Sequence, residues 1–186
     1  IIGLTGPIAA GKDEICRILR RRGAHIINVD KIGHRLLGQS TFFRNHNLNR
    51  HRLAQEVFSD PKKLRALEKL LHPGMVRAVK EELRRVQRPG SRYQKSLIVI
   101  NAAILKRMKL DRLCDEVWVV LAKKEIRLKR LLKKGLARKD ALVRMRPQPS
   151  EREYRKGADR IIENNGRKSD LTFNLFRAKL AFKGPV

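Results

Sequence analysis

Apolar residues form two kinds of pattern along this chain. Short continuous runs predict buried strands at 1–5, 25–29, 96–100, 115–122 and 158–166. Apolar residues at helical spacing predict helices at 13–22, 31–37, 102–110, 123–134, 138–146 and 171–182. Strands that alternate with helices are typical of an α/β fold with a parallel sheet. We therefore expect five parallel strands flanked by helices.

The segment between the second and third strands has a different pattern. Residues 39–50 have no strong period and predict a loop, whereas 51–59 and 61–88 have apolar residues at helical spacing. We expect these helices to be broken at Pro61 and at Pro73, with His72-Pro73 at a bend between two helices. A single histidine at such a bend is commonly structural.

The turn after the first strand carries the clearest chemical motif. The spacing G-x-x-x-x-G-K is met by Gly6, Pro7, Ile8, Ala9, Ala10, Gly11 and Lys12. Between a strand and a helix this spacing predicts a P-loop, in which backbone amides, the helix N-terminus and the lysine hold nucleotide phosphates. A Ser or Thr that binds Mg²⁺ normally follows, but Asp13 stands here. The alternative is an ordinary turn with an Asp placed favourably near a helix N-terminus.

Two polar residues stand where strands end. Asp30 follows the second apolar run and Asn101 follows the third. Ligands of open α/β sheets bind outside the carboxyl ends of the strands, so both residues are expected to face the P-loop. Asp30 is placed for a general base or a partner of Mg²⁺-bound water, or equally for an N-cap of the next helix. Asn101 cannot supply the negative charge that P-loop enzymes commonly have at its position.

Basic residues are in large excess, with 45 Lys and Arg against 18 acidic residues and a net charge of +27. Such a balance attracts polyanions. The basic residues are spread along the chain and aromatic residues are few, so nucleic acid is not the favoured partner. No apolar run reaches the roughly 20 residues of a membrane span. The stretch with Arg127, Arg130, Arg138 and Arg144 is either a solvated surface or a lid whose arginines close over phosphates.

The two cysteines and the N-terminal residues bear on the compartment. Cys16 and Cys114 lie far apart, each within an apolar pattern, which predicts two buried thiols in a reducing environment. Residues 1–5 lead straight into the P-loop, so we expect no targeting segment and a cytoplasmic location.

The order and spacing of several segments resemble dephospho-coenzyme A kinase, the family of the last step of coenzyme A biosynthesis. The resemblance runs from Ile2 to about Leu171 and rests on GLTGPIAAGK, GAHIINVDKIGH, LNRHRLAQEVFSD, LEKLLHP, DEVWVVLAKKEIRLKR, Arg144-x-x-x-Gln148 and ADRIIENNG. It implies one P-loop kinase domain over 1–186. A core of 1–38, 96–122 and 158–186 would carry a helical CoA-binding insertion at 39–95 and an arginine-rich lid at 123–157.

The resemblance also implies a reaction and a set of site residues. ATP with Mg²⁺ would phosphorylate the ribose 3′-hydroxyl of dephospho-CoA, in a protein that we expect to be a monomer. Asp30 would be the base, and Lys12 and Arg144 would act on the transferred phosphoryl group. ATP would be bound by Gly6, Pro7, Ile8, Ala9, Ala10, Gly11, Lys12, Asp13, Glu14, Arg138 and, on the adenine side, Asn164. The acceptor would be bound by Asp30, His34, Arg50, His72, Pro73 and Asn101.

The chain departs from this family at functional positions. Asp13 replaces a hydroxyl residue, Asn101 replaces an acidic one, and Arg107 stands where the family has a glutamate after a proline-leucine-leucine segment. One hypothesis is that Asp13 supplies a carboxylate to Mg²⁺ and offsets the neutral Asn101, leaving an active kinase. The other is that Asp13 repels the phosphates and leaves a pseudokinase that binds RNA or another polyanion. A related kinase that acts on a different small alcohol is a third possibility.

Overall fold

The sheet is the frame of the molecule. The computed structural model describes residues 1–39, 57, 60–166 and 170–171 of the 186-residue chain. Its five strands are β1 (Ile2–Thr5), β2 (His25–Asn28), β3 (Ile98–Asn101), β4 (Glu116–Leu121) and β5 (Arg160–Glu163). They pair in the order β2-β3-β1-β4-β5, and every pairing is parallel. The five predicted strands and the parallel sheet are therefore confirmed.

The strand register brings the expected site residues to one edge of the sheet. Leu4 of β1 and Asn28 of β2 both pair with Asn101 of β3. The segments that follow β1 and β2 therefore emerge beside Asn101, at the carboxyl ends of the strands. The P-loop and Asp30 belong to these two segments.

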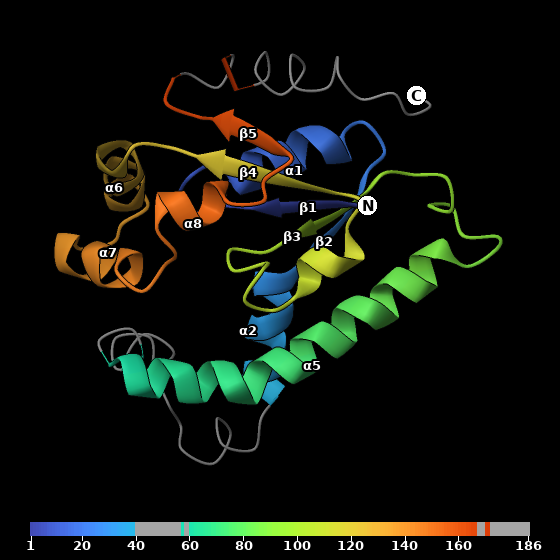
Figure 1. Ribbon diagram of the computed structural model, residues 1–186, viewed down its shortest axis with the longest axis horizontal. Coiled ribbons are helices and arrows are strands. Elements are labelled where there is room, and N and C mark those ends of the chain that lie inside the picture. The colour runs from blue at the N-terminus through green and yellow to red at the C-terminus, as the bar shows by residue number, and fades with distance from the viewer. Residues whose placement is uncertain (40–56, 58–59, 167–169, 172–186) are drawn as a thin grey trace.

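Helices cover both faces of the sheet (Figure 1). On one face, α1 (Lys12–Arg20) buries Ile15, Cys16 and Leu19 against the strands. On the other face lie α2 (Val29–Gln39) and α5 (Pro61–Gln87), together with the 3₁₀ helix η1 (Leu110–Leu113). α5 buries Met75 and Val79 there, in a core that also contains Ile100 and Leu110.

The predicted break at Pro73 is wrong, because α5 is a single 27-residue helix that contains Pro73. The apolar face that begins at Met75 holds its second half against α2, where a Cβ on Gly33 would lie 2.9 Å from Met75 Cε. This packing offsets the backbone hydrogen bond that proline cannot donate. Figure 1 shows that the helix changes direction near its middle, so the expected bend is present without a break.

The helix predicted at 102–110 is also wrong. Residues 103–109 form successive turns, and only Leu110–Leu113 form a short 3₁₀ helix. Lys109 adopts a left-handed conformation with φ 54°, which an α-helix cannot continue through. The apolar residues of the segment are still buried, since Leu105 and Leu110 are each fully inaccessible.

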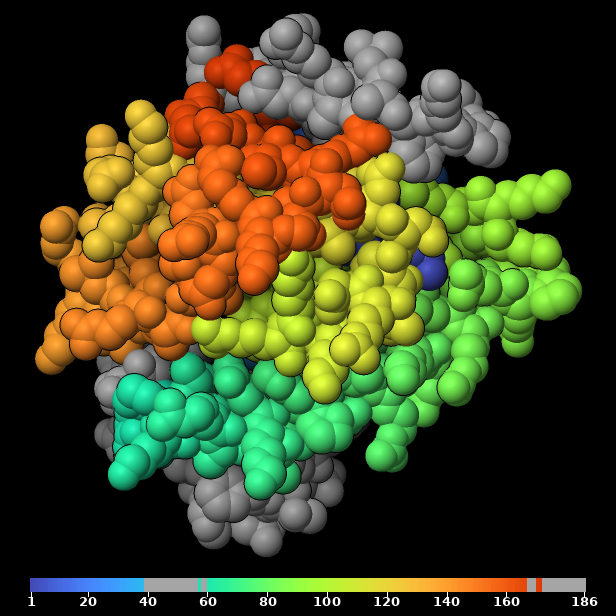
Figure 2. All heavy atoms as spheres, in the orientation of Figure 1, coloured from blue at the N-terminus to red at the C-terminus, as the bar shows by residue number. Residues whose placement is uncertain are grey.

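The segment predicted to be a lid contains three helices, namely α6 (Lys124–Lys133), α7 (Arg138–Met145) and α8 (Glu151–Arg155). The two basic helices were expected and α8 was not. A capping box between Ser150 and Glu153 starts α8, and Tyr154 anchors it in the core. In Figure 2 these helices form the gold to orange left side of the molecule, and α5 forms the teal to green band across its lower part.

The predicted loop at 39–50 begins one residue too early, because α2 includes Gln39. The rest of that loop lies outside the described residues, as do most of the 51–59 helix, Arg50 and the terminal helix beyond Leu171. Both cysteines are free; Cys16 is buried, as predicted, and Cys114 is half-buried. Burial raises the pKa of Cys16 to about 12, so this thiol stays protonated. Among the helices that the structure describes, none is long and apolar enough to cross a membrane.

Candidate active site

The loop between β1 and α1 has the backbone that the P-loop motif requires. Gly6 and Gly11 have φ values of 138° and 114°, and Ala9 is left-handed with φ 59°. A Cβ on Gly6 would lie 2.1 Å from the carbonyl oxygen of Val120, and one on Gly11 would lie 2.1 Å from Asn164 Nδ2. Both positions therefore require glycine for conformation and for space.

Four backbone amides of this loop, three of them consecutive, remain available to a ligand. The N–H groups of Ala9, Gly11, Lys12 and Asp13 form no hydrogen bond within the described part of the chain. They precede or begin α1, whose N-terminus adds partial positive charge. A curled run of unpaired amides at a helix N-terminus is an anion site, so this loop is built for phosphate.

Lys12 lies inside the loop rather than at the surface. Its Nζ donates to the carbonyl oxygens of Gly6 at 2.7 Å and Pro7 at 3.2 Å. Burial lowers its pKa from the ordinary value, and the negative charges of Asp30 and Asp13 oppose that change. The ammonium group is thus held by the loop, and two carboxylates act on it.

Asp30 lies in the first turn of α2 and is not its N-cap. The side chain of Asn28 caps the helix instead, because its Oδ1 accepts the Lys31 N–H at 2.9 Å. The N-cap alternative for Asp30 is therefore wrong, and its carboxylate is free for another role. A negative charge in the first turn is also favourable to the helix.

The surroundings of Asp30 suit a proton acceptor. Desolvation by the surrounding protein raises the pKa of this carboxyl, although its side chain stays open to solvent. Lys12, His34 and the N–H of Ala103 favour the charged form and limit the rise, while Asp13 adds to it. A raised pKa makes the carboxylate a stronger base than an ordinary aspartate.

The peptide at Ala103 ties Asp30 to the sheet and to the lid. Its N–H acts on the Asp30 carboxylate and favours the charged form of that group. Its carbonyl oxygen accepts the Thr5 hydroxyl at 3.1 Å and the Tyr154 hydroxyl at 3.0 Å. Thr5 ends β1 and Tyr154 is the buried residue of α8. Two hydroxyl groups therefore hold the Ala103 peptide whose N–H acts on Asp30.

The two unusual residues Asp13 and Asn101 contact each other. Asn101 Nδ2 donates to Asp13 Oδ1 at 3.2 Å. Asn101 is 1% exposed, and its Oδ1 is a buried atom with no hydrogen-bond partner among the described residues. Position 13 therefore carries the acid and position 101 a neutral polar group, so this pair of positions keeps one carboxylate.

Side chains from the lid and from the end of β5 hold the P-loop from outside. Arg130 donates to the carbonyl oxygens of Ala9 and Ala10, and also to Asn164. Asn164 Nδ2 donates to the Ala10 carbonyl oxygen at 2.7 Å. Gln148 Oε1 accepts the Ile8 N–H at 2.9 Å. The loop conformation therefore depends on residues more than 100 positions away.

Three further predicted ATP-site residues lie on helices, Glu14 on α1 and Arg138 and Arg144 on α7. Arg144 is half-buried on α7 and Arg138 is exposed at its start, and neither side chain forms a hydrogen bond or ion pair with the described residues. Glu14 forms an ion pair with Arg17 on α1, and its N–H bonds to the Gly11 carbonyl oxygen.

On the acceptor side, His34 lies one turn after Asp30 on α2, is exposed and acts electrostatically on it. His72 lies half-buried on α5 beside Pro73, and burial lowers its pKa. The opposing charge of Glu68 and the like charge of Arg107 also act on it. Arg50 lies outside the described residues.

Some contributors had little sequence signal. Arg130 was expected only as one of several lid arginines, and its role in holding the P-loop depends on the fold. Tyr154 and Thr5 act through a backbone carbonyl, which no side-chain motif marks. The capping box at Ser150 and Glu153 is a recognisable start of α8 and could have revealed that helix.

A parallel sheet with a P-loop after its first strand, a carboxylate near the loop lysine and a basic helical segment after β4 are typical of the P-loop kinase class. The family model for dephospho-CoA kinase matches residues 1–170. The chain belongs to the dephospho-CoA kinase family.

Individual relatives agree with this assignment. Dephospho-CoA kinase from Dehalococcoides mccartyi is 33% identical over 185 residues, which cover 92% of this chain and 91% of that protein. The enzyme of that name from Symbiobacterium thermophilum is 36% identical over 181 residues, covering 89% and 74%. The crystal structure of TT1252 from Thermus thermophilus has a TM-score of 0.76 and 31% identity, covering 98% of this chain and 97% of that one. Nothing in these comparisons favours the pseudokinase alternative.

Proposed function

We propose that this protein transfers the γ-phosphoryl group of ATP to the ribose 3′-hydroxyl of dephospho-CoA, giving coenzyme A and ADP. One observation carries the proposal beyond family membership. The four unpaired amides and Lys12 form a phosphate cradle, and Asp30 lies close enough to Lys12 for each to act on the other's pKa. Phosphoryl transfer requires this combination of a cradle and a base.

The P-loop binds the phosphates of ATP in this proposal. The amides of Ala9, Gly11, Lys12 and Asp13 donate to phosphate oxygens, and the Lys12 ammonium neutralises charge on the group being transferred. Ile8 contributes the shape of the loop, because its N–H is bonded to Gln148. These groups are already in position to hold the donor. Positioning of the reacting groups is the main requirement of the reaction.

Asp30 accepts the proton of the acceptor hydroxyl as its oxygen attacks phosphorus. The Ala103 N–H favours the charged carboxylate, whose lone pairs can accept from that hydroxyl. The transferred group loses its bond to the β-phosphate oxygen, and ADP leaves. His34 lies one turn along α2 and would contact the acceptor from the same side.

The residues present fit Mg²⁺, which prefers oxygen ligands. Asp13 offers a solvent-exposed carboxylate, and Asn101 offers the unpartnered amide oxygen beside it. When bound with ATP, Mg²⁺ neutralises phosphate charge. Asp13 would hold it directly, and Asn101 would orient the Asp13 carboxylate through its Nδ2–H.

The lid supplies the remaining positive charge. Arg144 contacts the transferred phosphoryl group and Arg138 contacts the ATP phosphates when the lid closes, which also excludes water. Neither guanidinium forms a hydrogen bond or ion pair with the described residues, so both are available. Asn164 supports ATP binding by holding the Ala10 carbonyl oxygen and the back of the loop.

The insertion completes the acceptor site. His72 and Pro73 on α5, together with Arg50, contact dephospho-CoA, and the lowered pKa of His72 keeps this side chain a neutral hydrogen-bonding group near pH 7. The protein acts as a monomer on ATP and dephospho-CoA. Its two free cysteines are consistent with the reducing cytoplasm.

An acceptor panel tests this proposal. Purified protein is incubated with ATP, Mg²⁺ and either dephospho-CoA, shikimate, gluconate or a nucleoside, and products are identified by mass spectrometry. We expect phosphorylation of dephospho-CoA alone, with the new phosphate on the 3′ position. Preferential phosphorylation of another alcohol would overturn the choice of acceptor and retain the kinase class.

A further inference from the structure

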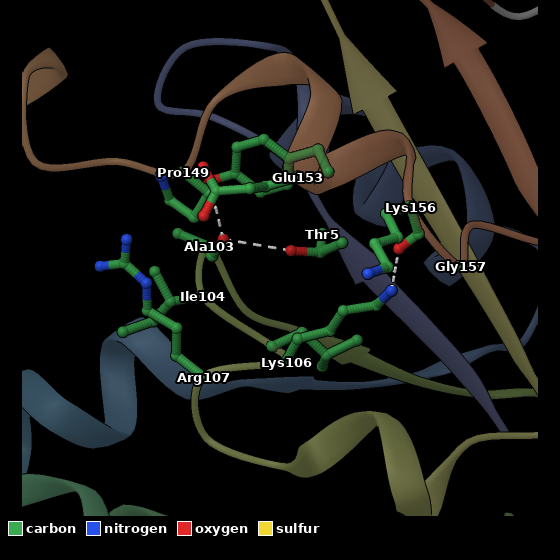
Figure 3. A pocket seen from close by; sticks show the side chains of 11 residues that line it. Thr5, Ala103, Ile104, Lys106, Arg107, Pro149, Glu153, Lys156 and Gly157 are labelled. Atoms are coloured by element: carbon green, nitrogen blue, oxygen red, sulfur yellow. Dashed lines mark hydrogen bonds between the residues drawn. The ribbon is translucent and has the colours of Figure 1, made fainter.

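A pocket of about 440 Å³ lies beneath α8, between that helix and the turns that follow β3 (Figure 3). Its volume is within the range of about 300–1,000 Å³ that is typical of small-molecule sites. Thr5 and Ala103 lie at its centre in Figure 3, with Pro149 and Glu153 on one side and Lys156 and Gly157 on another. None of the roles assigned above uses this space.

The pocket begins at the peptide that holds the base. The Ala103 N–H favours the charged form of the Asp30 carboxylate, and Ala103 also lines the pocket. Arg107 also lines the pocket, donates to the Pro147 carbonyl oxygen of the lid at 3.3 Å and acts electrostatically on His72 of α5. The hollow therefore extends from the reacting site toward the region where lid and insertion meet.

The lining combines apolar walls with a positive rim. Ile104, Leu105 and the ring of Tyr154 contribute apolar surface. Lys106 and Arg107 are exposed at the rim, and each donates to a lid carbonyl oxygen, which leaves further N–H groups for an anion. The one acidic residue of the lining, Glu153, already accepts from Ser150.

We propose that this pocket binds the pantetheine arm of dephospho-CoA and that Arg107 at its rim binds the acceptor's diphosphate. The inference rests on the proposed function. The acceptor's ribose hydroxyl must reach Asp30, and its diphosphate and its arm of methyl, methylene and amide groups must then lie nearby. Apolar walls suit the arm, and a guanidinium suits a diphosphate. The pocket thereby selects an acceptor that carries the arm.

Two variants separate the arm from the diphosphate. Ile104→Trp fills the pocket, and Arg107→Gln removes the rim charge while keeping a polar side chain. Ile161→Trp on β5 and Arg112→Gln on η1 are matched controls, because both residues are exposed outside the pocket. The two acceptors compared are dephospho-CoA and the β-methyl ester of ADP, which keeps the ribose and diphosphate but lacks the arm.

We expect Ile104→Trp to raise KM for dephospho-CoA by about tenfold or more, because the arm loses its buried apolar contacts. KM for the methyl ester and KM for ATP should stay unchanged. Arg107→Gln should raise KM for both acceptors, because both contain the diphosphate. Thermal unfolding of all four variants checks that each is folded.

An equal effect of Ile104→Trp on both acceptors, or no effect on either, would overturn the assignment of the arm to this pocket. Loss of turnover by the unmodified protein with every acceptor would instead overturn the proposed function. Calorimetric titration with dephospho-CoA would then still decide the pocket. Tighter binding to the unmodified protein than to Ile104→Trp supports the assignment, and equal binding refutes it.

Discussion

The contact between Asp13 and Asn101 permits a test by exchange. The variants are Asp13→Ser, Asn101→Asp and the double variant that contains both changes. Asp13→Ser leaves no carboxylate at positions 13 and 101, and Asn101→Asp leaves two. The double variant restores one carboxylate on the other side of the same 3.2 Å contact. If the pair acts as a unit, the double variant should perform better than either single variant.

The expected size of the effect follows from the contact. In Asn101→Asp, two carboxylates about 4 Å apart would repel by about 1 kcal/mol in water and about 4 kcal/mol at an effective dielectric of about 20. Asp13 is exposed and Asn101 is buried, so we take about 2 kcal/mol, or roughly 30-fold in an equilibrium constant. Asp13→Ser removes the carboxylate that we propose as a metal ligand and should weaken divalent-cation affinity by about tenfold or more.

Electron paramagnetic resonance of Mn²⁺ gives the affinity of each variant for the metal–nucleotide complex, independently of turnover. Urea denaturation without metal measures how much the repulsion in Asn101→Asp lowers the free energy of unfolding. Saturating Mg²⁺ and ATP should recover much of this lost stability. The double variant should bind Mn²⁺ and nucleotide within a few-fold of the unmodified protein. Unchanged Mn²⁺ affinity in Asp13→Ser, or a double variant worse than both singles, would refute the reasoning.

Three further predictions concern the base and the loop. Tyr154→Phe removes one of two hydrogen bonds to the Ala103 carbonyl oxygen, so kcat should fall about fivefold with KM for ATP unchanged. If kcat and its pH profile are unaltered, α8 does not position the base. Gly11→Ala should cost about 1–3 kcal/mol in urea denaturation and abolish nucleotide binding, whereas Gly23→Ala, at a similar positive φ but in open space, should leave binding intact. Asp30→Asn should lose transfer yet unfold at higher urea concentration than the unmodified protein at pH 7. Folding raises the pKa of the Asp30 carboxyl, so the ionised carboxylate destabilises the folded protein at pH 7. The stability difference between the two proteins should vanish below about pH 3.5, where Asp30 is protonated in both the folded and the unfolded state.

Strands and the P-loop could be predicted because their signals are local. A continuous run such as 96–100 has few conformations that bury it, and G-x-x-x-x-G-K after such a run requires a curled backbone. The predicted break at Pro73 and the predicted helix at 102–110 were wrong because they, too, rested on local signals alone. Those signals do not include the packing of the apolar face that keeps α5 continuous. They also do not reveal the left-handed conformation of Lys109, which an α-helix cannot include.

Contacts within the site could not be predicted, because they join residues far apart in sequence. Asp13 and Asn101 each stood out as unusual, but only the strand order brings them together. The Ala103 peptide has no side-chain signal at all, although it connects Asp30 to Tyr154. Sequence therefore identified the chemical groups, and the fold determined how they are held.

The most direct test of the account is a single-turnover measurement of phosphoryl transfer from ATP to dephospho-CoA with Mg²⁺. Product is quantified by mass spectrometry for the unmodified protein and for Asp30→Asn, with nucleotide binding measured for both. The account predicts coenzyme A from the unmodified protein, and a rate lower by at least about 100-fold in Asp30→Asn with ATP affinity retained. Equal rates in the two proteins would contradict the role of Asp30 as the base. No product from the folded, ATP-bound unmodified protein would contradict the kinase function itself.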